Sequence, residues 1–221
     1  MNKQQLVLLK QKLSKESSFL LGYEDFFKTG VCVLLLWQEG EYHFVFQKRS
    51  VHISQGGEIC FPGGKQDPTD MDFLETALRE TEEEMGIPRS KLDVVGPLGT
   101  LITPAGVMVE AFIAIANVDS LEEMKLNLQE VEKAFTVPVS YFKEKEPLRY
   151  GINIEMQPFE IDAKGAQTIL FPAGDFPGIP TSYTQPWTRS HKYPIYVYPL
   201  KQETLWGLTA HLVYEFIKRL S

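Results

Sequence analysis

The chain has 221 residues and a mass of 25.2 kDa, with 43% hydrophobic and 23% charged residues, a composition typical of a soluble globular protein. Its 29 acidic and 22 basic residues give a net charge of −7, the opposite sign from that expected of a general nucleic-acid binder. The two cysteines, Cys32 and Cys60, are too few and too far apart for a disulfide framework or a CxxC metal site, so both are expected to be buried as small apolar side chains.

The N-terminal segment, residues 1–17, places Leu6, Leu9 and Leu13 at helical spacing among lysines and glutamines. This spacing predicts a short amphipathic helix rather than a signal peptide, because no continuous apolar core follows it. The longest apolar run, Val31–Trp37, has seven residues, whereas a membrane helix needs about 20. We therefore expect a cytoplasmic protein with no membrane partner.

Apolar runs and helical periodicity predict strands and helices in turn along the chain. The predicted strands are Val31–Trp37, Tyr42–Gln47, Val94–Leu101 and Val107–Ala116, with a turn at Glu39-Gly40-Glu41. The predicted helices cover residues 72–85, 121–135 and 204–220. Strands interleaved with helices indicate an α/β fold, and the length suits a single domain over residues 1–221.

Residues 146–195 differ from the rest, with many of the prolines and a high density of aromatic residues. A segment of this length inside a compact domain is usually functional or carries structure of its own. A lid over a site, an arm that joins two copies in a homodimer and irregular packing are all compatible with it. In the C-terminal helix, Trp206 is expected in the core and Gly207 where the backbone packs closely.

The helix predicted over residues 72–85 has recognisable ends. Asp72 can cap its N-terminus with Glu75 as the capping-box partner, and Gly86 followed by Pro88 ends it. The stripe expected to face the core consists of Leu74, Leu78, Thr81 and Met85.

Three carboxylates, Glu80, Glu83 and Glu84, crowd one face of this helix. One interpretation is a solvated acidic face that is relieved by Arg79. The other is a site for a divalent cation, because hard cations prefer several oxygen ligands and remove the repulsion between carboxylates. The Gly-Gly loop at residues 63–64 favours the metal site, since its backbone can come close to a ligand.

This segment resembles the Nudix box, Gx5Ex7REUxEExGU, in which U is an aliphatic residue. The second half matches from Arg79 to Ile87, with Thr81 at an aliphatic position. The first half departs, because Asp70 stands where the pattern has Glu and eight residues instead of seven precede Arg79. If Asp70 takes the acidic role, its contact with Arg79 is expected to be longer or to need a different loop.

The resemblance implies a Nudix α/β/α sandwich with a mixed central sheet, and hydrolysis of a diphosphate linked to another moiety with Mg²⁺ or Mn²⁺. It implies that Glu80 and Glu84 are the main metal ligands and that the Gly64 carbonyl completes the shell. Glu83 is then a further ligand or positions water, and Arg79 belongs to the catalytic set.

Residues outside the box are similar to the coenzyme A diphosphatases of this family. The similar segments are Arg49-Ser50 with Gln55–Gly64, Lys65–Asp70 with its inserted residue, Glu130–Pro138, and Leu205–Ala210. They imply that Arg49, Ser50, Gly57 and Lys65 bind substrate.

The second arginine of that motif is missing from residues 51–55, and arginine forks suit phosphate. Lys48 or His52 could compensate for it. Alternatively, Arg49 forms a surface ion pair and His52 is a plain turn residue.

The expected reaction is attack of water on one phosphorus, assisted by a metal ion. Glu130 is the first choice for the general base and Glu83 the second, although Glu130 could also be an exposed carboxylate at the start of a helix. The expected substrate is a small nucleotide diphosphate, either coenzyme A or acyl-coenzyme A, giving 3′,5′-ADP and (acyl-)4′-phosphopantetheine. The alternatives are an ADP-ribose or dinucleotide diphosphatase and a nucleotide-binding module without turnover.

Overall fold

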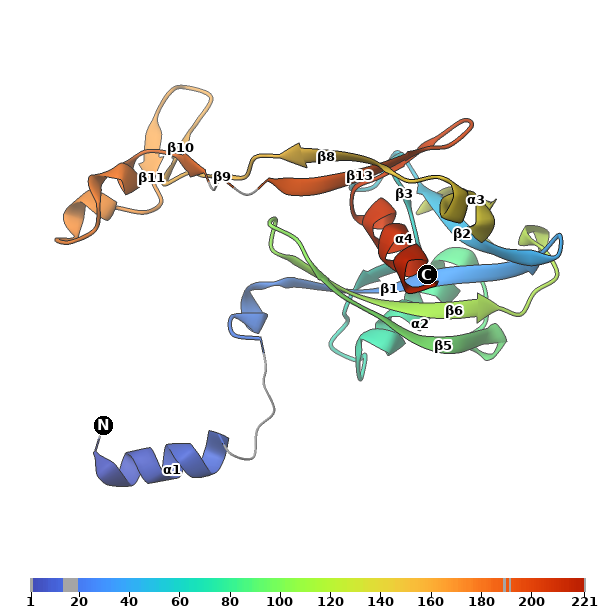
Figure 1. Ribbon diagram of the computed structural model, residues 1–221, viewed down its shortest axis with the longest axis horizontal. Coiled ribbons are helices and arrows are strands. Elements are labelled where there is room, and N and C mark those ends of the chain that lie inside the picture. The colour runs from blue at the N-terminus through green and yellow to red at the C-terminus, as the bar shows by residue number, and fades with distance from the viewer. Residues whose placement is uncertain (1, 14–19, 189, 191, 221) are drawn as a thin grey trace.

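A mixed sheet forms the centre of the protein (Figure 1). The computed structural model describes residues 2–13, 20–188, 190 and 192–220. The strands of this sheet are β1 (Phe27–Gln38), β2 (Glu41–Arg49), β3 (Ile59–Cys60), β4 (Gly63–Lys65), β5 (Leu92–Ile102), β6 (Val107–Ala116) and β7 (Val131–Pro138). They lie in the order β3-β2-β1-β6-β5, with β4 also paired to β1 and β7 to β2. β1 and β6 run parallel and the other pairs run antiparallel.

The hairpin of β1 and β2 turns where the sequence indicated. Glu39 and Gly40 have φ values of 53° and 88°, and Gln38 pairs with Glu41 across them. Positive φ at both central positions matches the twist of the two strands, which explains the glycine.

Helices cover both faces of the sheet. α2 (Phe73–Met85) lies on one face, and α3 (Val139–Glu144) and α4 (Gly207–Leu220) lie on the other. Because side chains alternate along a strand, Cys32 packs toward α2 and Val33 toward α4. This arrangement confirms the predicted α/β/α sandwich, while the single domain stays a prediction.

The N-terminal helix α1 (Lys3–Leu13) forms as predicted but has no buried residue, and Figure 1 shows it apart from the sheet. Residues 14–17 of that predicted segment lie outside the described residues. Short 3₁₀ helices are η1 (Tyr23–Asp25), η2 (Arg89–Lys91), η3 (Leu121–Glu123), η4 (Ala173–Asp175) and η5 (Thr181–Thr184). Within the described ranges, no helix combines the length and the apolar character needed to cross a bilayer.

The ends of α2 are as predicted, but its buried face is rotated. Asp72 Oδ1 accepts a hydrogen bond from the Glu75 N–H at 2.9 Å, and Gly86 ends the helix with a φ of 65°. The predicted Leu74 and Leu78 are only half-buried. The buried residues are Phe73, Thr76, Ala77, Thr81, Glu84 and Met85.

Gly30 on β1 explains this rotation. A Cβ atom there would lie 2.4 Å from the Phe73 carbonyl oxygen and 2.9 Å from the Thr76 Cβ. The helix therefore lies directly on the strand, and small side chains such as Thr76 and Ala77 take the positions that larger ones were expected to fill.

The helix predicted over residues 121–135 is wrong. Only η3 forms there, and β7 begins at Val131. Val131 and Phe135 are four residues apart, as on a helix, but apolar side chains also alternate toward Val137. Pairing with β2 along the whole strand decides the outcome.

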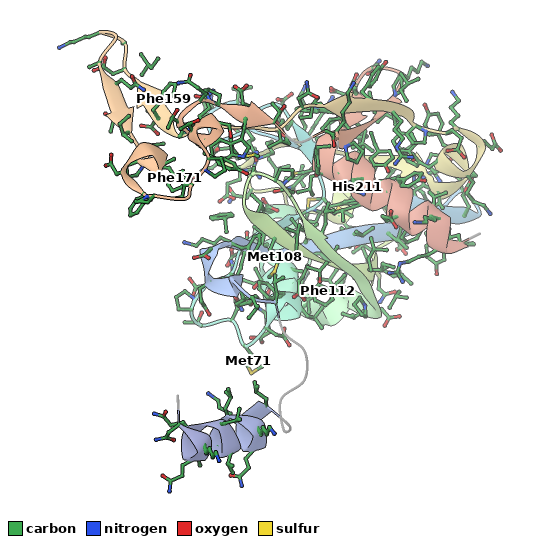
Figure 2. The ribbon with its side chains drawn as sticks, turned by 60° about the vertical axis from the view of Figure 1, so that its left-hand side comes forward. Met71, Met108, Phe112, Phe159, Phe171 and His211 are labelled. Atoms are coloured by element: carbon green, nitrogen blue, oxygen red, sulfur yellow. The ribbon has the colours of Figure 1, made fainter. Side chains whose placement is uncertain are left out.

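The described residues of the segment 146–195 form short paired strands and two 3₁₀ helices, and this segment is called the arm below. Its strands are β8 (Leu148–Ile152), β9 (Glu155–Met156), β10 (Phe159–Ile161), β11 (Gln167–Ile169), β12 (Trp187–Thr188) and the start of β13 (Tyr193–Pro199). β8 pairs with β13, β9 with β12, and β10 with β11. Figures 1 and 2 show the arm extending beyond the sheet, with Phe159 and Phe171 in its outer part.

The C-terminal helix is shorter than predicted. Residues Thr204–Trp206 form β14, which pairs with β13, and α4 begins at Gly207. Trp206 is 48% exposed, so its expected place in the core is wrong. Gly207 has a φ of 64°, and a Cβ atom there would meet nothing within 4 Å, so the strand-to-helix turn, and not close packing, accounts for this glycine.

Candidate functional site

The site centres on the second half of α2 where it faces β4. Gly64 lies directly against the Glu80 carboxylate, because a Cβ atom at Gly64 would be 2.5 Å from both Cδ and Oε1 of Glu80. Gly63 donates its N–H to Glu84 Oε2 at 3.0 Å. Gly63 and Gly64 lie in strand β4 and not in a loop as expected, but they meet the acidic helix as the sequence predicted.

Arg79 holds the acidic groups together. Its Nε and Nη2 donate to the two oxygens of Asp70, each at 3.0 Å, and its Nη1 donates to Glu80 at 2.8 Å and Glu83 at 3.0 Å. Of the two alternatives expected for Asp70, a longer contact with Arg79 or a different loop, the longer contact is not found. The loop accommodates the inserted residue by a turn in which the Asp67 N–H donates to Asp70 Oδ2 at 2.9 Å.

These bonds also fix the charge of Asp70. Its hydrogen bonds with Arg79 lower its pKa to about 2 despite desolvation. Asp70 thus takes the acidic role in this loop through a direct, two-point contact, which is the geometry that arginine favours with carboxylates.

Glu84 is the most buried acid of the site, with 3% of its side chain exposed. Burial raises its pKa to about 7, while hydrogen bonds from Gly63 N–H and the Gln47 side chain act in the opposite direction. The nearest cation, Arg49 Nη1, is 4.0 Å from Glu84 Oε1. The charge of Glu84 is therefore only partly compensated in the protein alone.

The pKa of Glu80 is raised as well. Burial raises its pKa, Arg79 lowers it, and the charges of Glu83 and Glu130 raise it further. The negative charge of Glu130 thus contributes to the raised pKa of Glu80.

Glu130 lies in the turn immediately before β7 and not at the start of a helix. Asn127 Nδ2 donates to its Oε1 at 3.3 Å, and its carbonyl oxygen accepts from the Ser50 N–H at 2.8 Å. This backbone hydrogen bond connects the turn to the end of β2. Ser50 is buried, and its N–H helps to position Glu130.

The other residues expected to bind substrate lie in two places, Arg49 and Gly57 together at the end of β2 and Lys65 on β4. Arg49 ends β2, and its Nε donates to the Ser54 carbonyl oxygen at 3.1 Å. Gly57 has a φ of 82° and donates its N–H to the Arg49 carbonyl oxygen at 2.9 Å. Lys65 has its ammonium 5.8 Å from the Phe27 ring centre, and its carbonyl oxygen accepts from Arg79 at 3.2 Å. Among these expected substrate residues, Arg49 has its guanidinium beside the carboxylates, with Nη1 4.0 Å from Glu84 Oε1.

Neither residue proposed to replace the missing arginine gains support. Lys48 Nζ lies 3.3 Å from Glu203 and 3.7 Å from Glu132, so its charge is already paired. His52 is exposed in a turn, in keeping with the plain turn interpretation.

The donor set suits a divalent cation by its chemistry. In the described part of the chain, no three acidic, histidine or cysteine side chains are gathered as a preformed metal centre, and Arg79 holds Glu80 and Glu83. Even so, the half-buried Glu80 and the buried Glu84, both with raised pKa values, offer the hard oxygen ligands that Mg²⁺ and Mn²⁺ prefer. Together with the Gly64 carbonyl they are the residues that would hold the ion.

Sequence reasoning missed one residue of this site, Gln47. It is fully buried on β2, its side chain lowers the pKa of Glu84, and its Nε2 donates to Cys60 Sγ at 3.6 Å. Cys60 is half-buried and not fully buried as expected. The signal in the sequence was a polar residue within an otherwise apolar strand segment, HFVFQ.

Comparisons with known proteins identify the family of the domain that holds this site. The NUDIX domain family matches residues 27–152, more than half of the chain. The chain is 36% identical over 116 residues to the peroxisomal coenzyme A diphosphatase NUDT7 of Mus musculus, covering 52% of this chain and 48% of that protein. It is 34% identical over 94 residues to the mitochondrial coenzyme A diphosphatase NUDT8 of Mus musculus, covering 42% and 45%. The matched regions thus span about half the length of these two relatives.

A longer match covers more of both chains. The uncharacterized Nudix hydrolase NudL of Photorhabdus laumondii is 27% identical over 167 residues, which are 76% of this chain and 71% of that protein. A MutT/nudix family protein from Enterococcus faecalis has a similar fold, with a TM-score of 0.51 at 13% identity, covering 100% of this chain and 70% of that one. By its domain match and its site, the chain belongs to the Nudix family.

Proposed function

We propose that the chain is a metal-dependent diphosphatase that hydrolyses coenzyme A or an acyl-coenzyme A to 3′,5′-ADP and (acyl-)4′-phosphopantetheine. The observation that carries the hydrolytic part is Glu84, a buried carboxylate held by the Gly63 N–H inside the matched domain and left without a full counter-charge. The coenzyme A part rests on the names of the two mouse relatives and on the similar Arg49-Ser50 motif.

The proposal assigns a separate role to the metal ligands and to Arg79. A bound Mg²⁺ or Mn²⁺ would lower the pKa of water and neutralise charge on the phosphoryl oxygens. Glu80, Glu84 and the Gly64 carbonyl would hold the ion, and Arg79 keeps Glu80 and Glu83 in place through its hydrogen bonds to both carboxylates.

Glu130 accepts the proton of the attacking water in this proposal. Its charge acts on the nearby Glu80, and its bond to Asn127 holds the side chain, so both observations support that role. Glu83 remains the second choice, since its side chain is 55% exposed and already paired with Arg79.

A second candidate is an ADP-ribose or dinucleotide diphosphatase. It is favoured by the missing arginine, because Lys48 is paired with Glu203 and leaves no clear replacement for a phosphate contact. The non-catalytic module is the least favoured, since a binding module has no need for acids as buried as Glu84.

A hydrolysis panel distinguishes these candidates. Coenzyme A, acyl-coenzyme A, ADP-ribose, NADH and diadenosine polyphosphates are incubated with Mg²⁺ or Mn²⁺, and the products are identified by mass, with the Glu84→Gln variant as control. Cleavage of coenzyme A to 3′,5′-ADP is the expected result. Intact coenzyme A beside cleaved ADP-ribose would select the second candidate, and nucleotide binding without any turnover would select the module.

The partners and location keep the status of predictions. A small nucleotide diphosphate is the proposed ligand, and a homodimer joined through the arm stays one of the alternatives given for residues 146–195. A cytoplasmic location is still expected from the sequence, although the two mouse relatives are named as peroxisomal and mitochondrial.

A further inference from the structure

A cavity lies between the arm and the tip of the β5–β6 hairpin (Figure 1). It has a volume of about 570 Å³ and is called the arm cavity below. Residues 102–104 line it from the hairpin, and Ile154, Met156, Trp187 and Tyr193 line it from the arm. Its volume falls within the range of roughly 300–1,000 Å³ that is typical of sites for small molecules.

The lining of the arm cavity favours an apolar ligand. None of the described residues that line it carries a charge. The Thr103 hydroxyl is already paired with the backbone of Val107, since Oγ1 accepts from its N–H at 3.1 Å and donates to its carbonyl oxygen at 3.2 Å. Ile154 and Met156 are half-buried between exposed neighbours, because alternation along the chain turns both toward the cavity. A charged group would find no counter-charge there, whereas an alkyl chain would be removed from water.

The arm cavity and the proposed metal site lie at the same end of the central sheet. One row of paired residues crosses β4, β1, β6 and β5, and it consists of Gly64, Gly30, Glu110 and Thr100. Ile102 is two residues beyond this row, toward the hairpin tip. Three strand spacings of about 4.8 Å and two residues of about 3.4 Å therefore place Ile102 roughly 16 Å from Gly64.

Lys65 and Phe27 lie between the metal site and the hairpin tip. Lys65 follows Gly64 on β4, and its ammonium is 5.8 Å from the centre of the exposed Phe27 ring. Phe27 begins β1, pairs with Val107, and donates its N–H to the Gly106 carbonyl oxygen at 2.8 Å. A molecule held at the metal site thus reaches the hairpin tip by passing Lys65, one of the residues expected to bind substrate.

The same distance separates the two reactive parts of the proposed substrate. From the diphosphate to the sulfur, phosphopantetheine is a chain of about 12 bonds, as many as in four residues of polypeptide, and it spans roughly 14 Å when extended. The acyl group of a coenzyme A thioester is attached at this sulfur. The adenosine end carries a 3′-phosphate, which an uncharged cavity does not favour.

We propose that the arm cavity binds the acyl chain of an acyl-coenzyme A whose diphosphate lies at the metal site. The inference rests on the proposed function, because it takes coenzyme A thioesters as substrates. It adds which part of the substrate the arm recognises, and it makes a medium-length acyl chain the preferred one.

The test compares kcat/KM of the full chain for octanoyl-coenzyme A and acetyl-coenzyme A, with Mg²⁺ and with 3′,5′-ADP as the measured product. Each methylene removed from water contributes about 4-fold, so burial of two of the additional methylenes favours octanoyl-coenzyme A by more than about 10-fold. Trp187→Ala removes a wall of the cavity and Ile102→Asp places a charge beside it, so both should bring the ratio below about 3. Val95→Asp, on an exposed side chain of the same strand as Ile102, should keep the wild-type ratio.

Trp37→Ala is the control for Trp187→Ala. Trp37 contacts Tyr42 edge-on with 4.9 Å between ring centres, as Trp187 contacts Tyr183 at 5.1 Å, but it lies near the other end of β1. It is not among the described residues that line the arm cavity, so the ratio should stay that of the wild type. Because both substrates are measured on one preparation, a partly unfolded variant changes both kcat/KM values equally and leaves their ratio unaffected.

The outcomes separate this inference from the function on which it rests. A wild-type ratio above about 10 that is lost in both cavity variants and kept in both controls supports the proposal. A wild-type ratio near 1, a ratio kept in either cavity variant, or an equal loss in the controls overturns the acyl site and leaves coenzyme A hydrolysis intact. Cleavage of ADP-ribose with coenzyme A and both thioesters left intact overturns the proposed function itself.

Discussion

Replacing Glu84 by glutamine should make the metal-free protein more stable at alkaline pH while abolishing activity. Burial raises the pKa of Glu84 from 4.5 to about 7. A carboxyl with a raised pKa in the folded state gives stability that is complete below pH 4.5 and is lost as the pH rises through about 7. Glutamine imitates the protonated form at every pH and keeps the bond from the Gly63 N–H.

The size of the effect follows from the same pKa values. The difference between 4.5 and about 7 corresponds to about 3 kcal/mol in the free energy of unfolding at pH 8 and above. The side chain is 3% exposed, so little of this is lost to solvent screening. For a chain of this length we expect Tm of Glu84→Gln to exceed that of the wild type by roughly 5–10 °C at pH 8, and by almost nothing at pH 5.

The assay is thermal unfolding followed by circular dichroism in EDTA, between pH 5 and pH 8.5. Glu82→Gln is the control, because Glu82 lies on the same helix with 47% of its side chain exposed. Added Mg²⁺ or Mn²⁺ should stabilise the wild type and not Glu84→Gln. A Tm difference between the wild type and Glu84→Gln that does not change with pH would refute the argument that Glu84 is buried with uncompensated charge.

Three further changes probe the rest of the site. Asp70→Asn should lower Tm at pH 7, because it weakens the hydrogen bonds from Arg79 that lower the Asp70 pKa to about 2. The Tm difference from the wild type should disappear as the pH falls from about 4 to 2, and a difference that stays constant would speak against this ion pair. Gly64→Ala should reduce kcat by about 100-fold, because its Cβ would displace the Glu80 carboxylate, while circular dichroism stays native; an unchanged kcat would show that Glu80 can move freely. Glu130→Gln should lower kcat by about 10²- to 10⁴-fold with an unchanged Mn²⁺ Kd, and an equal loss in Mn²⁺ binding would make Glu130 a metal ligand instead of the base.

The features that could be predicted from the sequence are those set by residues close together in the chain. The capping of α2 by Asp72, its end at Gly86 and the turn at Glu39-Gly40 depend on local conformation, and all three are present. The acidic cluster and the loop before it were also predictable, because helical spacing alone places Glu80 and Glu84 on one face.

What could not be predicted depends on partners far away in the chain. β7 is a strand because β2 lies beside it, although Val131 and Phe135 also fit a helix. The direct contact of Asp70 with Arg79 needs the actual path of the loop, which a count of residues does not give. Gln47 is buried because β2 lies between β3 and β7, where it pairs with Cys60 and Ala134, and this strand pairing is not visible in the sequence.

The arm leaves and rejoins the core at neighbouring points. Ile152 of β8 and Tyr193 of β13 face each other in register, so the excursion between them is closed at its base like a loop on a hairpin. The core side of β13 is fixed independently, since Tyr196 and Tyr198 are buried beneath α4. Such an excursion can be lengthened, shortened or exchanged without altering the register of the catalytic domain. We expect a chain in which residues 153–192 are replaced by a two-residue turn to keep its Tm within a few degrees and to retain Mn²⁺ binding, which would make the arm a separately variable part of the molecule.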